Sequence, residues 1–114
     1  MSAEPNRILI VDDDEAARYV KSHLLRRQGY VVSEAGLARD ALDLAGAEQP
    51  DLTLLDVKLP DASGIDVCRQ IKSRFPHMIV LQTSAAFTGV ADRTRALDGG
   101  ADSYLVEPID RTNW

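Results

Sequence analysis

The chain has few residues that suit a disulfide, a zinc site or a membrane span. It has one cysteine, Cys68, and two histidines, so it lacks the ligands for an internal disulfide or a cysteine-histidine zinc cluster. Residues 1–7 are polar and do not contain the apolar segment of a signal peptide. No apolar run approaches the length that spans a bilayer. We therefore expect a cytoplasmic protein without membrane contact.

Positive charge is also scarce. Thirteen lysines and arginines face 18 aspartates and glutamates, which gives a formal net charge of −5. Proteins that bind nucleic acid normally present a basic face, so this balance argues against direct nucleic-acid binding. The rest of the composition, 45% hydrophobic and 27% charged, is that of an ordinary globular domain.

Short apolar runs alternate with helical patterns along the chain. The runs at residues 8–11, 30–32, 52–55, 78–81 and 104–106 predict strands, and helical spacing predicts helices at about 15–28, 37–47, from Ser63 to about 71, and 90–97. This order predicts an α/β fold with a five-stranded parallel sheet covered by helices on both faces, giving three layers.

The ends of the predicted elements carry further expectations. In the first helix the apolar stripe is expected at Ala17, Val20, Leu24 and Leu25. A fifth helix should begin near Asp110, but the chain stops one turn later, so that helix is truncated. We expect residues 1–114 to form a single domain that is a piece of a longer protein.

Acidic and hydroxyl side chains follow four of the predicted strands. They are Asp12 and Asp13 after the first, Asp56 after the third, Thr83 and Ser84 after the fourth, and Glu107 after the fifth. The carboxyl ends of parallel strands meet at one edge of a sheet, where functional groups gather. Carboxylates crowded at that edge repel one another unless a cation lies among them. Oxygen ligands without histidine or cysteine suit a hard ion, so the pattern predicts a Mg²⁺ site.

Each of these residues also has a plain structural interpretation. Asp12, Asp13 and Asp14 precede a helix, and acids favour helix N-termini; Asp14 is the best candidate for a capping residue. Alone, Ser84 would be an ordinary loop hydroxyl, and Tyr104 an aromatic at the edge of the core. The combination of Asp12 and Asp13 with Asp56 favours a functional site.

Four motifs in the correct order resemble one family. Residues 8–15 read Ile-Leu-Ile-Val-Asp-Asp-Asp-Glu, residues 51–60 read Asp-Leu-Thr-Leu-Leu-Asp-Val-Lys-Leu-Pro with Gly64 beyond them, and residues 100–105 read Gly-Ala-Asp-Ser-Tyr-Leu before Pro108. From Arg7 to Ile109 the chain resembles the response-regulator receiver domains of two-component signalling. The resemblance implies a flavodoxin-like, doubly wound (βα)5 fold, similar to the chemotaxis-type receiver, with strand order 2-1-3-4-5.

The resemblance also implies a role for each acidic residue of the pocket. Asp56 resembles the phosphoacceptor. Asp13 and Asp56 resemble direct Mg²⁺ ligands, with Asp12 acting largely through water. The backbone carbonyl of Lys58 matches the third protein ligand.

Two further residues match the parts that change when such a domain is phosphorylated. Ser84 resembles the hydroxyl that binds the phosphoryl group, with Thr83 as the adjacent alternative. Tyr104 matches the aromatic whose ring moves inward when that hydroxyl engages. Together they predict a switched surface near strands four and five.

Glu107 departs from the family pattern, which has a lysine before the proline that follows strand five. A glutamate there would repel a phosphoryl group, so we expect Glu107 to turn away or to pair with a cation. Lys58 is the nearest candidate in sequence, either as the partner of Glu107 or as a substitute for the missing lysine; otherwise it is a solvated loop residue. The corresponding bond of the family is cis, and the sequence leaves the isomer of the Glu107-Pro108 bond open.

The function that follows is phosphoacceptance on Asp56 from a histidine kinase or a histidine phosphotransfer domain. Such a domain is not an enzyme beyond its own phosphorylation and dephosphorylation. The alternative is a pseudo-receiver, a protein-interaction module without phosphate control, which Glu107 favours. Aspartate-nucleophile phosphatases need a second aspartate where this chain has Lys58. A downstream output domain or a homodimer is the further partner expected.

Overall fold

A computed structural model of the chain describes residues 6–84 and 90–106, without the side chains of residues 90–92. The predictions for Glu107, for its bond to Pro108 and for a short fifth helix lie outside these residues. None of the described helices is both long and apolar enough to cross a membrane.

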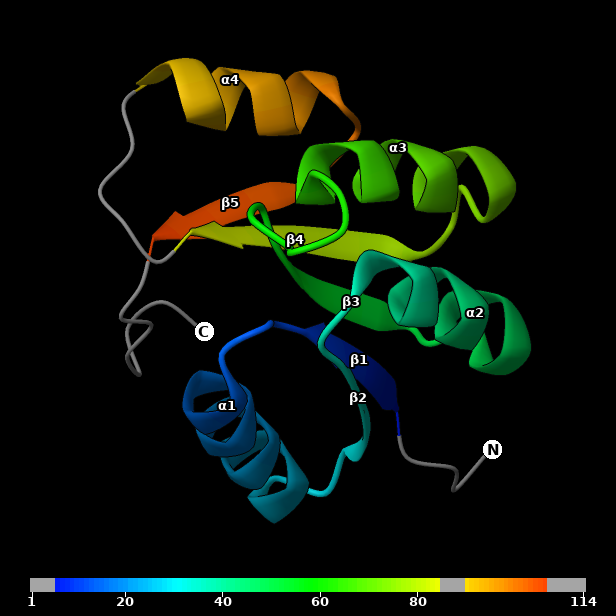
Figure 1. Cartoon of the computed structure of the whole chain (residues 1–114). Coiled ribbons are helices and arrows are strands. Elements are labelled where there is room, and N and C mark those ends of the chain that lie inside the picture. Colours follow the sequence, from blue (N-terminus) through cyan, green and yellow to red (C-terminus); the bar gives the residue numbers. More distant parts are fainter. Residues whose placement is uncertain (1–5, 85–89, 107–114) are drawn as a thin grey trace.

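Within the described residues, five strands alternate with four helices (Figure 1). In chain order they are β1 (Arg7–Val11), α1 (Glu15–Arg27), β2 (Val31–Ala35), α2 (Ala38–Glu48), β3 (Leu52–Asp56), α3 (Gly64–Arg74), β4 (Ile79–Ser84), α4 (Val90–Asp98) and β5 (Ser103–Val106). All neighbouring strands pair in parallel, in the order β2-β1-β3-β4-β5. The α/β class predicted from the sequence and the strand order implied by the family resemblance are both confirmed.

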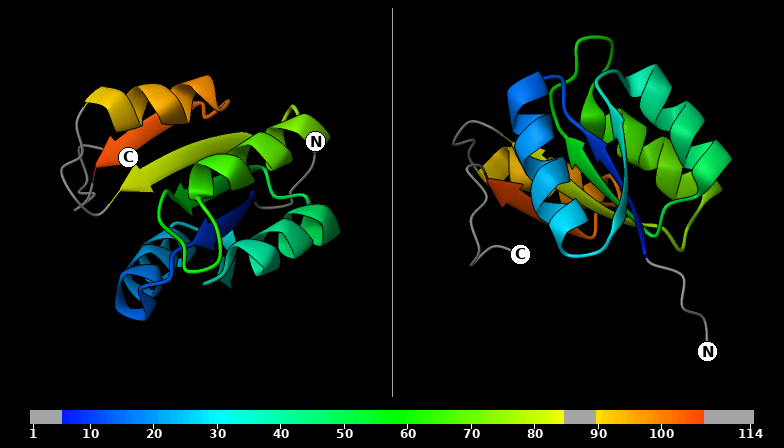
Figure 2. Two further views of the ribbon diagram at one scale, coloured as in Figure 1. Left: turned by 45° about the horizontal axis from the view of Figure 1, so that its top comes forward. Right: turned by 90° about the horizontal axis from the view of Figure 1, so that it is seen from below.

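The helices cover both faces of the sheet, α1 on one face and α2, α3 and α4 on the other (Figures 1 and 2). Alternation along β1 divides the core accordingly. Ile8 and Ile10 pack with Leu25 of α1, whereas Leu9 and Val11 belong to the cluster that contains the inner residues of α2 and α3. A strand that is buried on both faces needs apolar residues at every position, which explains the continuous run at 8–11.

Side chains from the loops define where the helices begin. Asp14 caps α1 by accepting hydrogen bonds from the N–H groups of Ala16 and Ala17, as predicted, and Ser63 caps α3 by accepting one from Ile65. Helix α2 has no cap of its own, since Leu37 precedes it.

The cap of α2 comes from a distant loop. Asp61, between β3 and α3, accepts hydrogen bonds from the N–H groups of Ala38 at 2.7 Å and Arg39 at 3.1 Å. These bonds, chiefly the one from Ala38, lower the pKa of the Asp61 carboxyl below its ordinary value. The contact ties the loop that follows Asp56 to the start of α2.

The predicted apolar stripe of α1 is wrong in part. Val20 and Leu24 are exposed, whereas Lys21, Ser22 and Leu25 are buried. Residues three and four apart share a face of a helix, so the inner face carries Lys21 and Ser22 one turn before Leu25. A buried lysine needs a charged partner, and that partner lies at the carboxyl edge of the sheet.

Candidate functional site

Three carboxylates meet where β1 and β3 end. Val11 and Leu55 are register partners on these adjacent strands, so Asp12 and Asp56, one residue later on each, lie next to each other. Asp12, Asp13 and Asp56 each offer a carboxylate oxygen within 4.8 Å of the other two. Asp12 and Asp56 are buried and Asp13 is exposed. The sequence predicted this cluster from strand ends alone.

Backbone amides hold two of these carboxylates in place. Asp12 Oδ1 accepts a hydrogen bond from the N–H of Asp14 at 2.9 Å, and Asp56 Oδ1 accepts one from the N–H of Lys58 at 3.1 Å. Both contacts span two residues, the geometry in which aspartates stabilise turns. Each turn fixes one oxygen of its carboxylate and thereby orients the other.

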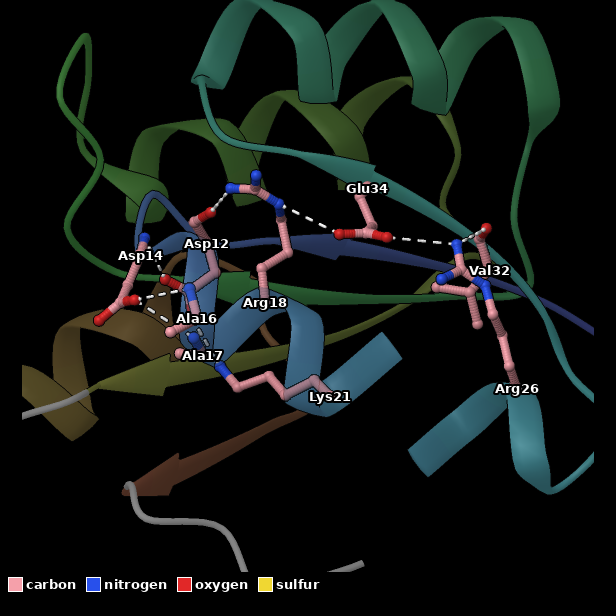
Figure 3. Close-up of polar contacts among 9 residues, drawn as sticks. All are labelled: Asp12, Asp14, Ala16, Ala17, Arg18, Lys21, Arg26, Val32 and Glu34. Carbon is pink, nitrogen blue, oxygen red and sulfur yellow. Dashed lines mark hydrogen bonds and ion pairs between the residues drawn. The ribbon is translucent and has the colours of Figure 1, made fainter. Parts of the chain in front are cut away.

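The second oxygen of Asp12 accepts a hydrogen bond from a lysine that the sequence analysis missed. Lys21 Nζ lies 2.8 Å from Asp12 Oδ2, and the two side chains are 8% and 3% exposed. Figure 3 shows Lys21 reaching from α1 to Asp12. The one signal in the sequence was its spacing, four residues before the inward-facing Leu25.

A second cation of α1 contacts the backbone of the same residue. One terminal nitrogen of Arg18 donates to the carbonyl of Asp12 at 2.7 Å, and its Nε donates to Glu34 of β2 at 3.2 Å (Figure 3). Arg26 binds the other oxygen of Glu34. These contacts fix α1 against β1 and β2 beside the acidic cluster.

Gly64 allows α3 to begin directly against the end of β3. A Cβ atom at this position would lie 1.9 Å from the carbonyl oxygen of Asp56, closer than any side chain tolerates. The N–H of Gly64 donates to the carbonyl of Val57 at 2.6 Å. The glycine of the sequence motif is therefore required by the close approach of two backbones.

A cavity of about 560 Å³ lies beside the loop that follows Asp56. It is lined by residues 57–63 of the β3–α3 loop and by Ile65, Ser84 and Arg95. Ser84 reaches it from the end of β4, the strand next to β3. The loop after Asp56 and the predicted hydroxyl residue thus border one space.

The two candidate hydroxyls differ in their surroundings. Successive residues of a strand point to opposite faces, so Thr83 and Ser84 do not point the same way. Thr83 pairs with Asp56 across the strands, and within the described part of the chain its buried Oγ1 has no hydrogen-bond partner. Thr83 does not line the cavity that Ser84 lines.

Tyr104 is buried against Ile65 and Ala96, beside α4.

Lys58 is exposed, and its side chain forms no ion pair with any residue in the described ranges. Whether it meets Glu107 lies outside those ranges. Only its backbone takes part in the described cluster, through the N–H bound to Asp56.

Other side chains that can do chemistry are buried, exposed or bound elsewhere in the fold. Cys68 is buried in α3, and burial raises the pKa of its thiol to about 11, which leaves it protonated and unreactive at neutral pH. His23 and His77 are exposed. Asp102 binds Lys72 and the N–H of Val80, where it precedes β5 at the opposite edge of the sheet.

The donor atoms of the cluster fit a hard divalent cation. Each of the three aspartates offers a carboxylate oxygen, and one of the three residues is open to solvent. Mg²⁺ keeps several waters and is commonly held by one or two carboxylates, so this half-open arrangement suits it.

Comparison with known families identifies the domain. The model of the response regulator receiver domain matches residues 8–113. The chain is 42% identical over 105 residues to the response regulator MprA of Mycolicibacterium vanbaalenii, covering 92% of this chain and 45% of that protein. It is 39% identical over 109 residues to the transcriptional regulatory protein PdtaR of Mycobacterium tuberculosis, covering 95% and 52%. The chain therefore belongs to the response regulator receiver family, and it spans about half the length of these curated relatives.

Solved structures agree with this assignment. A CheY-like receiver domain protein from Methanospirillum hungatei superposes with a TM-score of 0.89 at 31% identity, covering 94% of this chain and 85% of that one. A response regulator from Burkholderia pseudomallei, solved with a phosphorylated aspartic acid, a calcium ion and citrate, superposes with a TM-score of 0.86 at 30% identity, covering 92% and 61%. Receiver domains of this family bind Mg²⁺ at an acidic pocket, and this chain has an acidic cluster of Asp12, Asp13 and Asp56.

Proposed function

We propose that this domain accepts a phosphoryl group on Asp56 from a histidine kinase or a histidine phosphotransfer domain. The observation that carries the proposal is the meeting of Asp12, Asp13 and Asp56 at one edge of the sheet. The Burkholderia relative supports it, because its structure contains a phosphorylated aspartic acid and a metal ion.

Asp56 is well placed to act as the nucleophile. Its Oδ1 is held by the N–H of Lys58, which orients the carboxylate at the end of β3. A carboxylate oxygen forms a bond to phosphorus in line with the leaving group, and the imidazole nitrogen of the donor keeps the electron pair of the broken bond. Preorganisation of the carboxylate lowers the entropic part of the barrier.

A Mg²⁺ ion would be held by Asp13, Asp56 and the carbonyl of Lys58, with Asp12 acting through water. When bound, the ion neutralises the phosphoryl oxygens and orients them for attack. The residues of this chain contribute the remaining parts: backbone N–H groups that fix the carboxylates, and a hydroxyl at the end of β4.

Ser84 is the hydroxyl assigned to the phosphoryl group, with Thr83 as the alternative. Ser84 lines the cavity next to the loop after Asp56, where added phosphoryl oxygens would accept its hydrogen bond. A displacement of Ser84 toward them would open space on the face where Tyr104 packs beside α4. This coupling would change the surface around β4 and β5.

Glu107 supports a second candidate, a pseudo-receiver that binds partners without phosphate control. In the first candidate Glu107 points away from the phosphoryl group or is paired with a cation, Lys58 among the possible partners. The partners of the first candidate are a kinase or phosphotransfer domain, with an output domain or a second copy of the chain as a further partner.

Labelling with a small phosphodonor separates the two candidates. The domain is incubated with [³²P]acetyl phosphate, with and without Mg²⁺, beside the variant Asp56→Asn, which keeps the shape of the side chain. We expect Mg²⁺-dependent labelling of the parent domain and none of the variant. Absence of labelling in the parent would support the pseudo-receiver, and equal labelling of Asp56→Asn would place the acceptor elsewhere.

A further inference from the structure

We propose that Lys21 is a positioning residue of the acidic pocket: it holds Asp12 in place and supplies a positive charge that limits the excess negative charge of the pocket when Asp56 is phosphorylated. This inference rests on the proposed function. It concerns a residue of α1, outside the strand ends and loops that supply the rest of the site.

Burial distinguishes Lys21 from the other lysines of the chain. Lys58 is exposed, and Lys72 is partly buried at the opposite edge of the sheet. Lys21 is 6% exposed as a residue. A buried ammonium group is strongly destabilising unless it is paired, and Asp12 Oδ2 provides that pairing at 2.8 Å. The sequence thus places a fixed positive charge directly beside the cluster.

The charge of the pocket indicates that Lys21 neutralises part of the negative charge of the carboxylates. The three carboxylates carry three negative charges, and a divalent cation would leave one, which the ammonium group of Lys21 balances. A phosphoryl group on Asp56 replaces a singly charged carboxylate with a group of nearly two charges. Without Lys21 the phosphorylated pocket would carry a larger excess of negative charge in a region shielded from solvent.

Other cations near the pocket are less suited to this task. Arg18 donates to the backbone carbonyl of Asp12 and forms an ion pair with Glu34 of β2. Its guanidinium group therefore lies between Asp12 and Glu34, on the β2 side of β1 (Figure 3). Lys58 is exposed and forms no ion pair in the described part of the chain. The residue that follows β5 in the sequence, position 107, is a glutamate.

Loss of the Lys21 charge should have opposite effects on two ligands. Lys21 and a metal ion both neutralise the same carboxylates, so removing the ammonium group should leave Mg²⁺ affinity unchanged or strengthen it severalfold. The same change should lower the affinity of the pocket for a phosphoryl group by about tenfold or more, because a favourable electrostatic interaction is lost. A purely structural role for the ion pair would lower both together with thermal stability.

The test compares Lys21→Gln and Lys21→Met with a matched control, Lys72→Met. Glutamine removes the charge and keeps an N–H donor on a side chain one bond shorter, whereas methionine removes both the charge and the donor. The control breaks the Lys72–Asp102 ion pair at the far edge of the sheet. Mg²⁺ affinity is measured by calorimetry, phosphoryl binding by acetyl phosphate labelling and by beryllofluoride affinity, and folding by thermal melting, with Asp56→Asn alongside.

We expect both Lys21 variants to lose about tenfold or more in labelling and beryllofluoride affinity while Mg²⁺ affinity holds or rises, and Lys72→Met to match the parent in both. Labelling within twofold of the parent in Lys21→Gln, with Asp56→Asn unlabelled, would overturn the inference and leave the proposed function intact. Mg²⁺ affinity that falls in step with melting temperature would also overturn it. Labelling of Asp56→Asn would overturn the proposed function and the role of Lys21 with it.

Discussion

The three consecutive aspartates at residues 12–14 have different structural roles, although they form one acidic run in the sequence. Asp14 caps α1, Asp12 is buried and bound to Lys21, and Asp13 is the exposed member of the cluster. Adjacent positions around a strand end point in different directions, and this alone separates a cap from a ligand.

Substitutions of Ser84 and Thr83 test whether adjacent residues at a strand end have different roles. We expect Ser84→Ala to be labelled on Asp56 but to lose the conformational response to beryllofluoride, because this hydroxyl borders the cavity. We expect Thr83→Val to retain the response and to leave the free energy of unfolding unchanged or raise it by about 1 kcal/mol, since its buried Oγ1 has no hydrogen-bond partner within the described residues.

Amide NMR spectra recorded before and after beryllofluoride addition measure the response, and chemical denaturation measures stability. If Thr83→Val lost the response and Ser84→Ala kept it, the roles of the two hydroxyls would have to be exchanged.

At the scale of elements, the loop after β3 is built by contacts that span the chain. Gly64 brings the start of α3 against Asp56, and Asp61 caps α2. Both contacts hold the segment that contains Lys58, whose N–H fixes the Asp56 carboxylate. The site therefore depends on helix ends that lie far from it in sequence.

The cap of α2 gives a pH-dependent prediction. Because its hydrogen bonds lower the pKa of Asp61 below 3.8 in the folded state, Asp61 stabilises the fold fully above its unfolded pKa. That contribution is lost as pH falls through the lower folded pKa. We expect Asp61→Ala to melt a few degrees below the parent at pH 7, and the difference to shrink below about pH 4.

Melting curves from pH 7 down to pH 3 measure this difference. The control is Asp43→Ala, which removes an exposed carboxylate from α2 that has no hydrogen bond among the described residues. A difference for Asp61→Ala that is constant with pH would show that the carboxylate charge does not carry the cap.

Element positions were largely predictable, because periodicity and strand-end chemistry are local. The buried strands β1 and β3 are within one residue of their predicted bounds. Strand β2 was predicted at 30–32 but runs over Val31–Ala35, since pairing with β1 extends it through the polar residues Ser33 and Glu34. Tertiary pairing overrides a weak local pattern.

The contacts that were missed are those between elements. The pairing of Lys21 with Asp12 depends on how α1 is rotated against the sheet, and the apolar pattern favoured Val20 and Leu24 as the inner residues. The cap from Asp61 joins residues 23 apart, and no local signal marks it. Pattern analysis identifies which residues can do chemistry, whereas packing decides which of them meet.

For the whole molecule, the sheet order places the strand-end residues of the proposed site at one edge. Strands β1, β3 and β4 are neighbours, so Asp12, Asp56 and Ser84 meet there, and Tyr104 of β5 packs behind them. Lys72 and Asp102 form an ion pair at the opposite edge, where they contribute to the fold and not to the proposed site. This separation allows the pocket to be altered without changing the far half of the core.

The most direct test of the central claim is to locate the acyl phosphate chemically. Borohydride reduces an aspartyl phosphate to homoserine, which marks the acceptor residue permanently and is found by peptide mass spectrometry. After incubation with acetyl phosphate and Mg²⁺, we predict homoserine at position 56 and unmodified aspartate at Asp12 and Asp13. Homoserine at either of those positions, or at none of the three, would contradict Asp56 as the phosphoacceptor.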